Sequence, residues 1–138
     1  VDIQRFFRLI LFNFVTSNDD AHLKNFSLIE YNGEYRLSPA YDLVNTALQL
    51  REPRIFALDK GLFREGMAFS DTRTIRRADF EEFGRRIGLP EKVVRKEIEL
   101  FLSDQPLTYE LLERSFLSKE LKKQYRQTFD YRRRMLGF

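Results

Sequence analysis

The sequence has no cysteine and no tryptophan, and it has a single histidine among its 138 residues. The lack of cysteine excludes a disulfide scaffold, a thiolate metal site and a cysteine nucleophile, and it favours the reducing cytoplasm as the compartment. A membrane-spanning helix needs about 20 apolar residues. The longest apolar run, around Phe6 to Val15, is interrupted by Arg8 and Asn13. The sequence also lacks the small-residue cleavage site of a secretory signal. We therefore expect a cytoplasmic protein with no membrane partner.

Length and composition indicate one globular domain. The chain is 43% hydrophobic and 14% aromatic, which is enough to close a core at this length. It begins at Val1 and not at a methionine, and it enters a hydrophobic helical pattern at once. We therefore expect residues 1–138 to form a single domain that is a piece of a longer protein.

The hydrophobic pattern predicts a mainly helical fold with one small β-hairpin, an α+β class. Residues 1–16 carry apolar side chains at i, i+3, i+4 and i+7, with others on the remaining sides, so we expect a helix buried nearly all round. The dipeptide Asn32-Gly33 tolerates positive φ and predicts a hairpin between strands 26–31 and 34–37. Loops and short helices are expected from 43 to 74. Four further helices are predicted over residues 78–87, 90–102, 109–116 and 119–135.

A loop between the first helix and the hairpin concentrates polar side chains that packing rarely needs. Residues 18–25 read NDDAHLKN. Asp20 and Asn25 have the spacing of the protein-kinase catalytic loop, in which the Asp accepts the substrate hydroxyl proton and the Asn binds magnesium. Asp42 follows the hairpin, where kinases carry a second metal-binding Asp. The order of these residues predicts a site for phosphoryl transfer.

The chemistry of phosphoryl transfer assigns a role to each of these side chains. Charge on the β- and γ-phosphates must be neutralised, and oxygen ligands suit a hard ion such as magnesium. Asn25 and Asp42 are therefore the predicted metal ligands, and Asp20 is the predicted general base. The predicted cofactors are ATP and Mg²⁺. The spacing of Asp20 and Asn25 alone is weak evidence, and the prediction depends on the whole set occurring in order.

The segments FNFVTSNDDAHLKNFSLI and YRLSPAYDLVNT, joined through an Asn-Gly turn, resemble the HipA toxin kinase family. The resemblance is strong from about Phe12 to Thr46 and looser in the closing helices. It implies the C-terminal lobe of a protein-kinase-like fold, with Asp20 as the catalytic base. Asp19 falls at a variable position of the family pattern and is not the predicted base. The resemblance further implies nucleotide contacts for His22, Lys24, Asn25, Tyr41 and Asp42, and metal binding for Asn25 and Asp42.

The same resemblance implies a function. It indicates a serine/threonine-protein kinase of a toxin–antitoxin system that phosphorylates a serine of a protein of the translation apparatus, such as an aminoacyl-tRNA synthetase. The expected partner is a DNA-binding antitoxin of the HipB type. Residues 1–138 contain no glycine-rich phosphate loop and no strand with the ATP-binding lysine. We therefore expect the nucleotide-binding N-terminal lobe to lie outside this HipA-like C-terminal domain, on the same chain or a separate one, and the domain alone to be inactive.

Two other functions remain open at this point. The last twenty residues hold seven basic side chains, so the C-terminal helix could contact nucleic acid, although exposed interleaved aromatic residues and a binding motif are missing. A metal-dependent hydrolase built on Asp19, Asp20, His22 and Asp42 is the second alternative, but it would need further ligands. The basic residues of the C-terminal helix are Lys119, Lys122, Lys123, Arg126, Arg132, Arg133 and Arg134.

Overall fold

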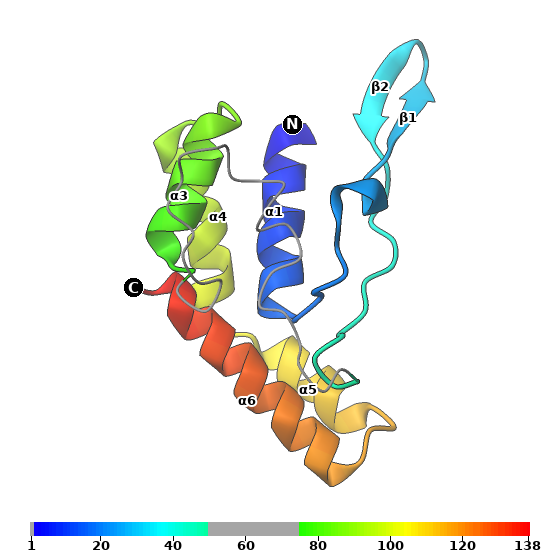
Figure 1. Ribbon diagram of the computed structural model, residues 1–138, viewed down its shortest axis with the longest axis vertical. Coiled ribbons are helices and arrows are strands. Elements are labelled where there is room, and N and C mark those ends of the chain that lie inside the picture. The colour runs from blue at the N-terminus through cyan, green and yellow to red at the C-terminus, as the bar shows by residue number, and fades with distance from the viewer. Residues whose placement is uncertain (1, 50–74) are drawn as a thin grey trace.

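The computed structural model describes residues 2–49 and 75–138. Across these residues the fold consists of five α-helices, a short 3₁₀-helix and a two-stranded antiparallel sheet (Figure 1). The predicted α+β class, mainly helical with a small hairpin, is confirmed. Residues 43–49 contain turns and no helix or strand. The rest of the predicted loop and short-helix region lies outside the described residues.

Helix α1, Asp2–Val15, is the element around which the others pack. It contacts α4, α6 and the second strand. Its buried side chains form the centre of the core with residues of α3, α4 and α6. The expectation that this helix is buried nearly all round is wrong on one side, because Ile3 is 51% and Phe12 36% exposed. The core residues contributed by α1 are Phe7, Ile10, Leu11, Phe14 and Val15.

Helices α3, Arg77–Arg86, and α4, Glu91–Leu102, form a closely packed pair. The chain leaves α3 through Gly88, whose φ of 83° is left-handed. The amides of Gly88 and Leu89 then bond the carbonyls of Arg85 and Gly84, which is the Schellman arrangement that a glycine after a helix favours. Side chains of Phe80 and Phe83 in α3 join the core.

Helices α5, Pro106–Arg114, and α6, Lys119–Leu136, complete the body. Ser118 caps α6 by accepting a hydrogen bond from the amide of Leu121. Arg133 of α6 donates to the carbonyls of Phe101, Leu102 and Ser103, and so satisfies the C-terminal end of α4. Among the described residues, no helix is long and apolar enough to span a bilayer.

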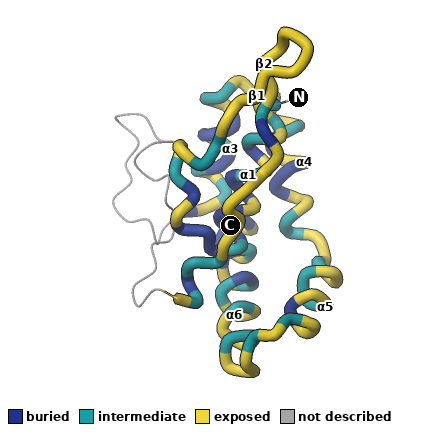
Figure 2. The backbone as a smooth tube through the Cα atoms, turned by 90° about the vertical axis from the view of Figure 1, so that its right-hand side faces the viewer, coloured by how far each residue is buried: buried dark blue, intermediate teal, exposed yellow. Residues whose placement is uncertain are grey.

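The hairpin of β1, Leu28–Tyr31, and β2, Glu34–Leu37, extends away from the helical body (Figures 1 and 2). Leu28 pairs with Leu37 and Tyr31 with Glu34. Asn32 and Gly33 have φ values of 54° and 80°, as the Asn-Gly turn requires. The residues of both strands are exposed apart from Leu37, which is intermediate. The hairpin carries the chain out from the loop at residues 18–25 and back to Asp42.

Candidate active site

The loop that follows α1 turns sharply and then enters the 3₁₀-helix η1, Leu23–Asn25. Ser17 has a left-handed φ of 59°, and the amide of Asn18 bonds the carbonyl of Asn13 at 2.9 Å. The amide of Asn25 bonds the carbonyl of His22 at 2.8 Å. Short polar side chains favour such turns over a continued helix. The Asn25 side chain consequently lies at the end of η1, beside the segment that returns from the hairpin.

Asn25 joins the two halves of the predicted site. Its Nδ2 donates to the carboxylate Oδ2 of Asp42 at 3.2 Å and to the backbone carbonyl of Asp20 at 3.1 Å. Two side chains that both hold magnesium should lie within about 4 to 6 Å of each other, and the observed distance between Asn25 and Asp42 is shorter. Because Nδ2 is engaged twice, the amide oxygen is the atom that Asn25 could offer to a cation.

Asp42 occupies a strained backbone position. Its φ is 55°, in the left-handed region, which costs a residue other than glycine about 1 to 2 kcal/mol. The Asp42 carbonyl accepts a hydrogen bond from Asn18 Nδ2 at 3.0 Å and one from the amide of Val44 at 3.1 Å. These bonds over-determine the conformation, which is the usual condition for strain at a functional residue.

Asp20 and His22 lie next to each other on the open surface. Asp20 Oδ1 is 3.5 Å from His22 Nε2, and the Asp20 side chain is 66% exposed. The amide of His22 donates to the Asp20 carbonyl at 2.8 Å. The Asp20 carboxylate is therefore accessible to an incoming hydroxyl group.

Lys24 and Tyr41 are close in sequence to the residues of the site, and they differ in their contacts. Lys24 is exposed and has no ion-pair partner among residues 2–49 and 75–138. Tyr41 is 46% exposed, and its hydroxyl accepts a hydrogen bond from Ser27 at 3.4 Å. The structure thus brings Asp20, His22, Asn25 and Asp42 together, with Lys24 and Tyr41 at the neighbouring chain positions.

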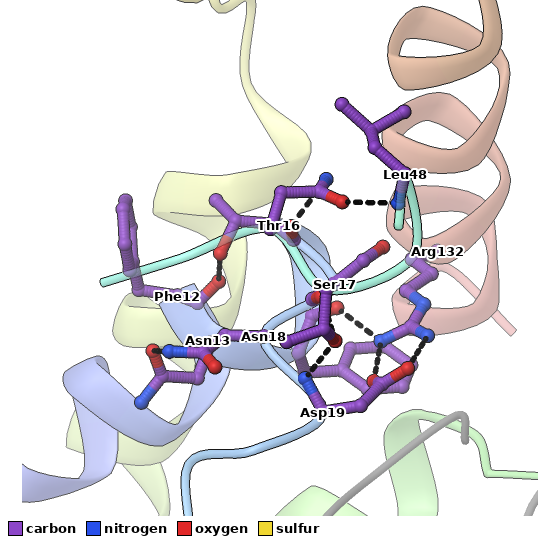
Figure 3. A network of polar contacts seen from close by, with 11 residues as sticks. Phe12, Asn13, Thr16, Ser17, Asn18, Asp19, Leu48 and Arg132 are labelled. Atoms are coloured by element: carbon purple, nitrogen blue, oxygen red, sulfur yellow. Dashed lines mark hydrogen bonds and ion pairs between the residues drawn. The ribbon is translucent and has the colours of Figure 1, made fainter. Parts of the chain in front are cut away.

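Asp19 faces the interior, opposite to Asp20. Arg132 of α6 donates to both of its carboxylate oxygens, at 3.0 and 3.3 Å (Figure 3). It also donates to the carbonyl of Phe14 at 3.0 Å. Burial raises the pKa of the Asp19 carboxyl above its usual value, and the hydrogen bonds and charge of Arg132 offset this only in part. Asp19 is thus unsuited to bind metal at the surface. The described residues, which include Asp19, Asp20, His22 and Asp42 of the hydrolase alternative, contain no group of three or more His, Asp or Glu placed to hold a metal.

Several residues that fix the site were not identified from the sequence. Thr46 Oγ1 accepts from the amide of Asp19 at 3.0 Å and donates to the carbonyl of Ser17 at 3.1 Å. Asn45 Nδ2 donates to the carbonyl of Thr16 at 2.8 Å. Both residues lie within YDLVNT, so their place after Asp42 was a usable signal. Arg132 carried no such signal, because it is one of seven basic residues in the C-terminal helix.

Comparisons with known proteins identify relatives of this chain. The sequence model of a family described as HipA-like C-terminal domain matches residues 1–106. A Haemophilus influenzae (strain Rd) protein named "Putative kinase" is 30% identical over 128 residues. That alignment covers 80% of this chain and 35% of the relative, so the chain spans about a third of the relative's length. The family match includes the loop, the hairpin and Asp42, whereas α6 lies beyond it.

Proposed function

The chain belongs to the family of HipA-like C-terminal domains, and from this premise we propose that it carries the catalytic loop of a serine/threonine-protein kinase. In this proposal the γ-phosphate of ATP passes to a serine of a protein substrate. The observation that carries the proposal is the Asn25 side chain, which bonds both the Asp42 carboxylate and the Asp20 carbonyl. The kinase catalytic loop requires this grouping of an Asp, an Asn and a second Asp.

Each residue has a role in the proposed reaction. Asp20, exposed and bonded through its backbone to Asn25, orients the serine hydroxyl and accepts its proton. Lys24 and His22 face water close to this carboxylate along the loop and would meet the nucleotide. Tyr41 is proposed as a further nucleotide contact beside Asp42.

The oxygen atoms at the site suit magnesium. The Asn25 amide oxygen and the Asp42 carboxylate would hold the ion, because both are hard oxygen donors and they lie within hydrogen-bond reach of each other. When bound, magnesium neutralises charge on the phosphates. Asn25 and Asp42 hold their positions through contacts within the chain, namely the 3₁₀ turn and the bond from Asn18 to the Asp42 carbonyl.

The biological setting is proposed from the family alone. It comprises a toxin–antitoxin system in the cytoplasm, a HipB-like DNA-binding antitoxin and a substrate of the translation apparatus such as an aminoacyl-tRNA synthetase. A nucleotide-binding lobe, on the same or another chain, would complete the ATP site.

The nucleic-acid alternative gains little from the structure, because four basic residues of α6 contact protein groups. Arg132 binds Asp19, and Arg133 binds the end of α4. Arg126 pairs with Glu113, and Lys122 donates to the Glu113 carbonyl. Because these four side chains contact protein groups, fewer basic side chains of α6 are left to bind phosphate groups.

The kinase proposal is tested in the full-length protein that contains this chain. Asp20→Ala should abolish transfer of phosphate from labelled ATP and leave nucleotide affinity nearly unchanged, because the base acts on the hydroxyl. Asp42→Ala should also weaken binding of magnesium-ATP, measured by calorimetry. Asp104→Ala, an exposed carboxylate beyond the end of α4, is the control and should change neither quantity. Equal losses of ATP affinity in the Asp20 and Asp42 variants would contradict these roles, and absence of transfer by the unsubstituted protein would refute the function.

A further inference from the structure

A buried ion pair connects the site loop to the last helix of the chain. The Asp19 side chain is 1% exposed and that of Arg132 5%. Their positions are 113 residues apart in the sequence. The guanidinium donates two hydrogen bonds to the carboxylate (Figure 3). It also donates to the Phe14 carbonyl at the end of α1. A planar, bidentate contact of this kind fixes orientation as well as distance.

The pair lies one peptide unit from the proposed base. Asp19 points into the fold and Asp20 points to water, so the peptide that joins them sets the direction of both side chains. The Asp19 amide donates a hydrogen bond to Thr46, which lies four residues after Asp42. The Asp20 carbonyl accepts a hydrogen bond from Asn25. Any shift of the Asp19 carboxylate therefore moves a peptide whose other end is part of the site.

We propose that Arg132 is a positioning residue for Asp20: it holds Asp19 inside the fold and thereby fixes the neighbouring carboxylate toward the substrate hydroxyl. The inference rests on the proposed kinase function. Arg132 is buried and contacts Asp19 and the Phe14 carbonyl, and in this proposal it affects Asp20 through Asp19 and the peptide that follows. The expected consequence is an effect on the chemical step and not on ATP binding.

The test uses Arg132→Lys in the full-length protein, because lysine keeps the charge but cannot make the two-pronged contact. Misplacement of a reacting group by about 1 Å can cost about 100-fold in rate, so kcat should fall about 10- to 100-fold while the Kd for magnesium-ATP stays within about twofold. Arg8→Lys is the matched control, because Arg8 makes a similar two-pronged contact with buried Glu97 away from the site. It should leave kcat unchanged when both variants are folded at the assay temperature.

Two further measurements separate positioning from stability. Asp19→Asn, alone and with Arg132→Lys, forms a double-mutant cycle in which the double variant should lose no more than the worse single variant. Hydrogen exchange should become faster over residues 18–25 in Arg132→Lys and stay unchanged in α4. The hydrogen-exchange measurement needs no activity. It therefore tests whether Arg132 fixes the loop even if the unsubstituted protein transfers no phosphate and the proposed function fails.

Three results would overturn the inference. The first is a folded Arg132→Lys protein with kcat within about twofold of the parent, and the second is an equal loss in Arg8→Lys. The third is failure of both Arg132→Lys and Asp19→Asn to fold, which would assign the pair to stability alone.

Discussion

Two arginine–carboxylate pairs tie distant elements of this protein together, one in the helical body and one at the site loop. Glu97 of α4, fully buried, accepts three hydrogen bonds: from Arg8 at 2.6 and 2.8 Å, and from Gln4 at 2.5 Å. Asp19 receives bonds from Arg132 at 3.0 and 3.3 Å. Arg8 is half exposed, whereas Arg132 is buried.

The pKa values of the two carboxyls shift in opposite directions. The hydrogen bond from Arg8 lowers the pKa of Glu97, and it outweighs the desolvation that burial causes. At Asp19 desolvation outweighs the contribution of Arg132, and the pKa rises. An arginine partner thus does not by itself decide the direction in which the pKa of a buried carboxyl shifts. The balance between desolvation and the hydrogen bonds to the carboxylate decides the direction.

The largest expected effect comes from Arg132→Met, which leaves Asp19 in the interior without its cation. Removal of one partner from a buried pair costs about 3 to 5 kcal/mol of unfolding free energy. Arg8→Met, the matched change in the body, should cost about 1 to 3 kcal/mol, because Glu97 keeps Gln4 and gains access to water. Urea unfolding followed by circular dichroism measures both. Equal losses would show that the depth of the arginine does not distinguish the two pairs.

The helical body and the site loop should also differ in their response to a change in the size of one side chain. A Cβ atom at Gly84 would lie 2.4 Å from Val94 Cγ2, so Gly84→Ala forces α3 and α4 apart. Overpacking of this kind costs about 1 to 3 kcal/mol, reduced by the helix preference of alanine, about 1 kcal/mol. Val94→Ala in the same chain should recover part of the loss in thermal unfolding. A Gly84→Ala protein as stable as the parent would mean that this contact has room to adjust.

In the site loop, replacement of a residue by glycine should instead stabilise the folded protein. Ser17 has a φ of 59°, and its buried hydroxyl has no hydrogen-bond partner within the part of the chain that the structure describes. Ser17→Gly relieves both penalties and should raise the unfolding free energy by about 1 kcal/mol. Ser17→Ala removes only the hydroxyl and keeps the strained backbone, so its gain should be smaller. If alanine stabilises as much as glycine in urea unfolding, backbone strain at this residue is not the cause.

The smallest expected effect is a pH dependence of stability that runs in opposite directions for the two pairs. The folded pKa of Asp19 lies above its unfolded value, so its contribution to stability is complete below the unfolded pKa and is lost as the pH rises through the folded one. Glu97 behaves in the reverse way, since its contribution is present above the unfolded pKa and is lost as the pH falls through the folded one.

Acidification from about pH 7 to about pH 3 should therefore widen the stability gap between the parent and Asp19→Asn. It should narrow the gap between the parent and Glu97→Gln. Urea unfolding of the three proteins across this range measures both gaps. A parallel trend in the two variants would contradict the opposite pKa shifts.

Local sequence signals predicted much of this protein. Helix α1 and the hairpin follow from the spacing of apolar residues and from Asn32-Gly33, because hydrophobic periodicity and turn chemistry act over a few residues. The neighbourhood of Asn25 and Asp42 was also predictable, since a short hairpin must return the chain close to where it left. The roles of Asp20, His22, Lys24 and Tyr41 remain predictions.

Only the tertiary structure decided which of two adjacent aspartates faces water. The sequence determined that Asp19 and Asp20 sit together on a polar loop, and the resemblance to a family favoured Asp20. The inward direction of Asp19 depends on Arg132, 113 residues away, and on the packing of α6 against α1. One buried arginine among seven basic residues of a helix has no local signature, because its burial is a property of the assembled core and not of its neighbours in the chain.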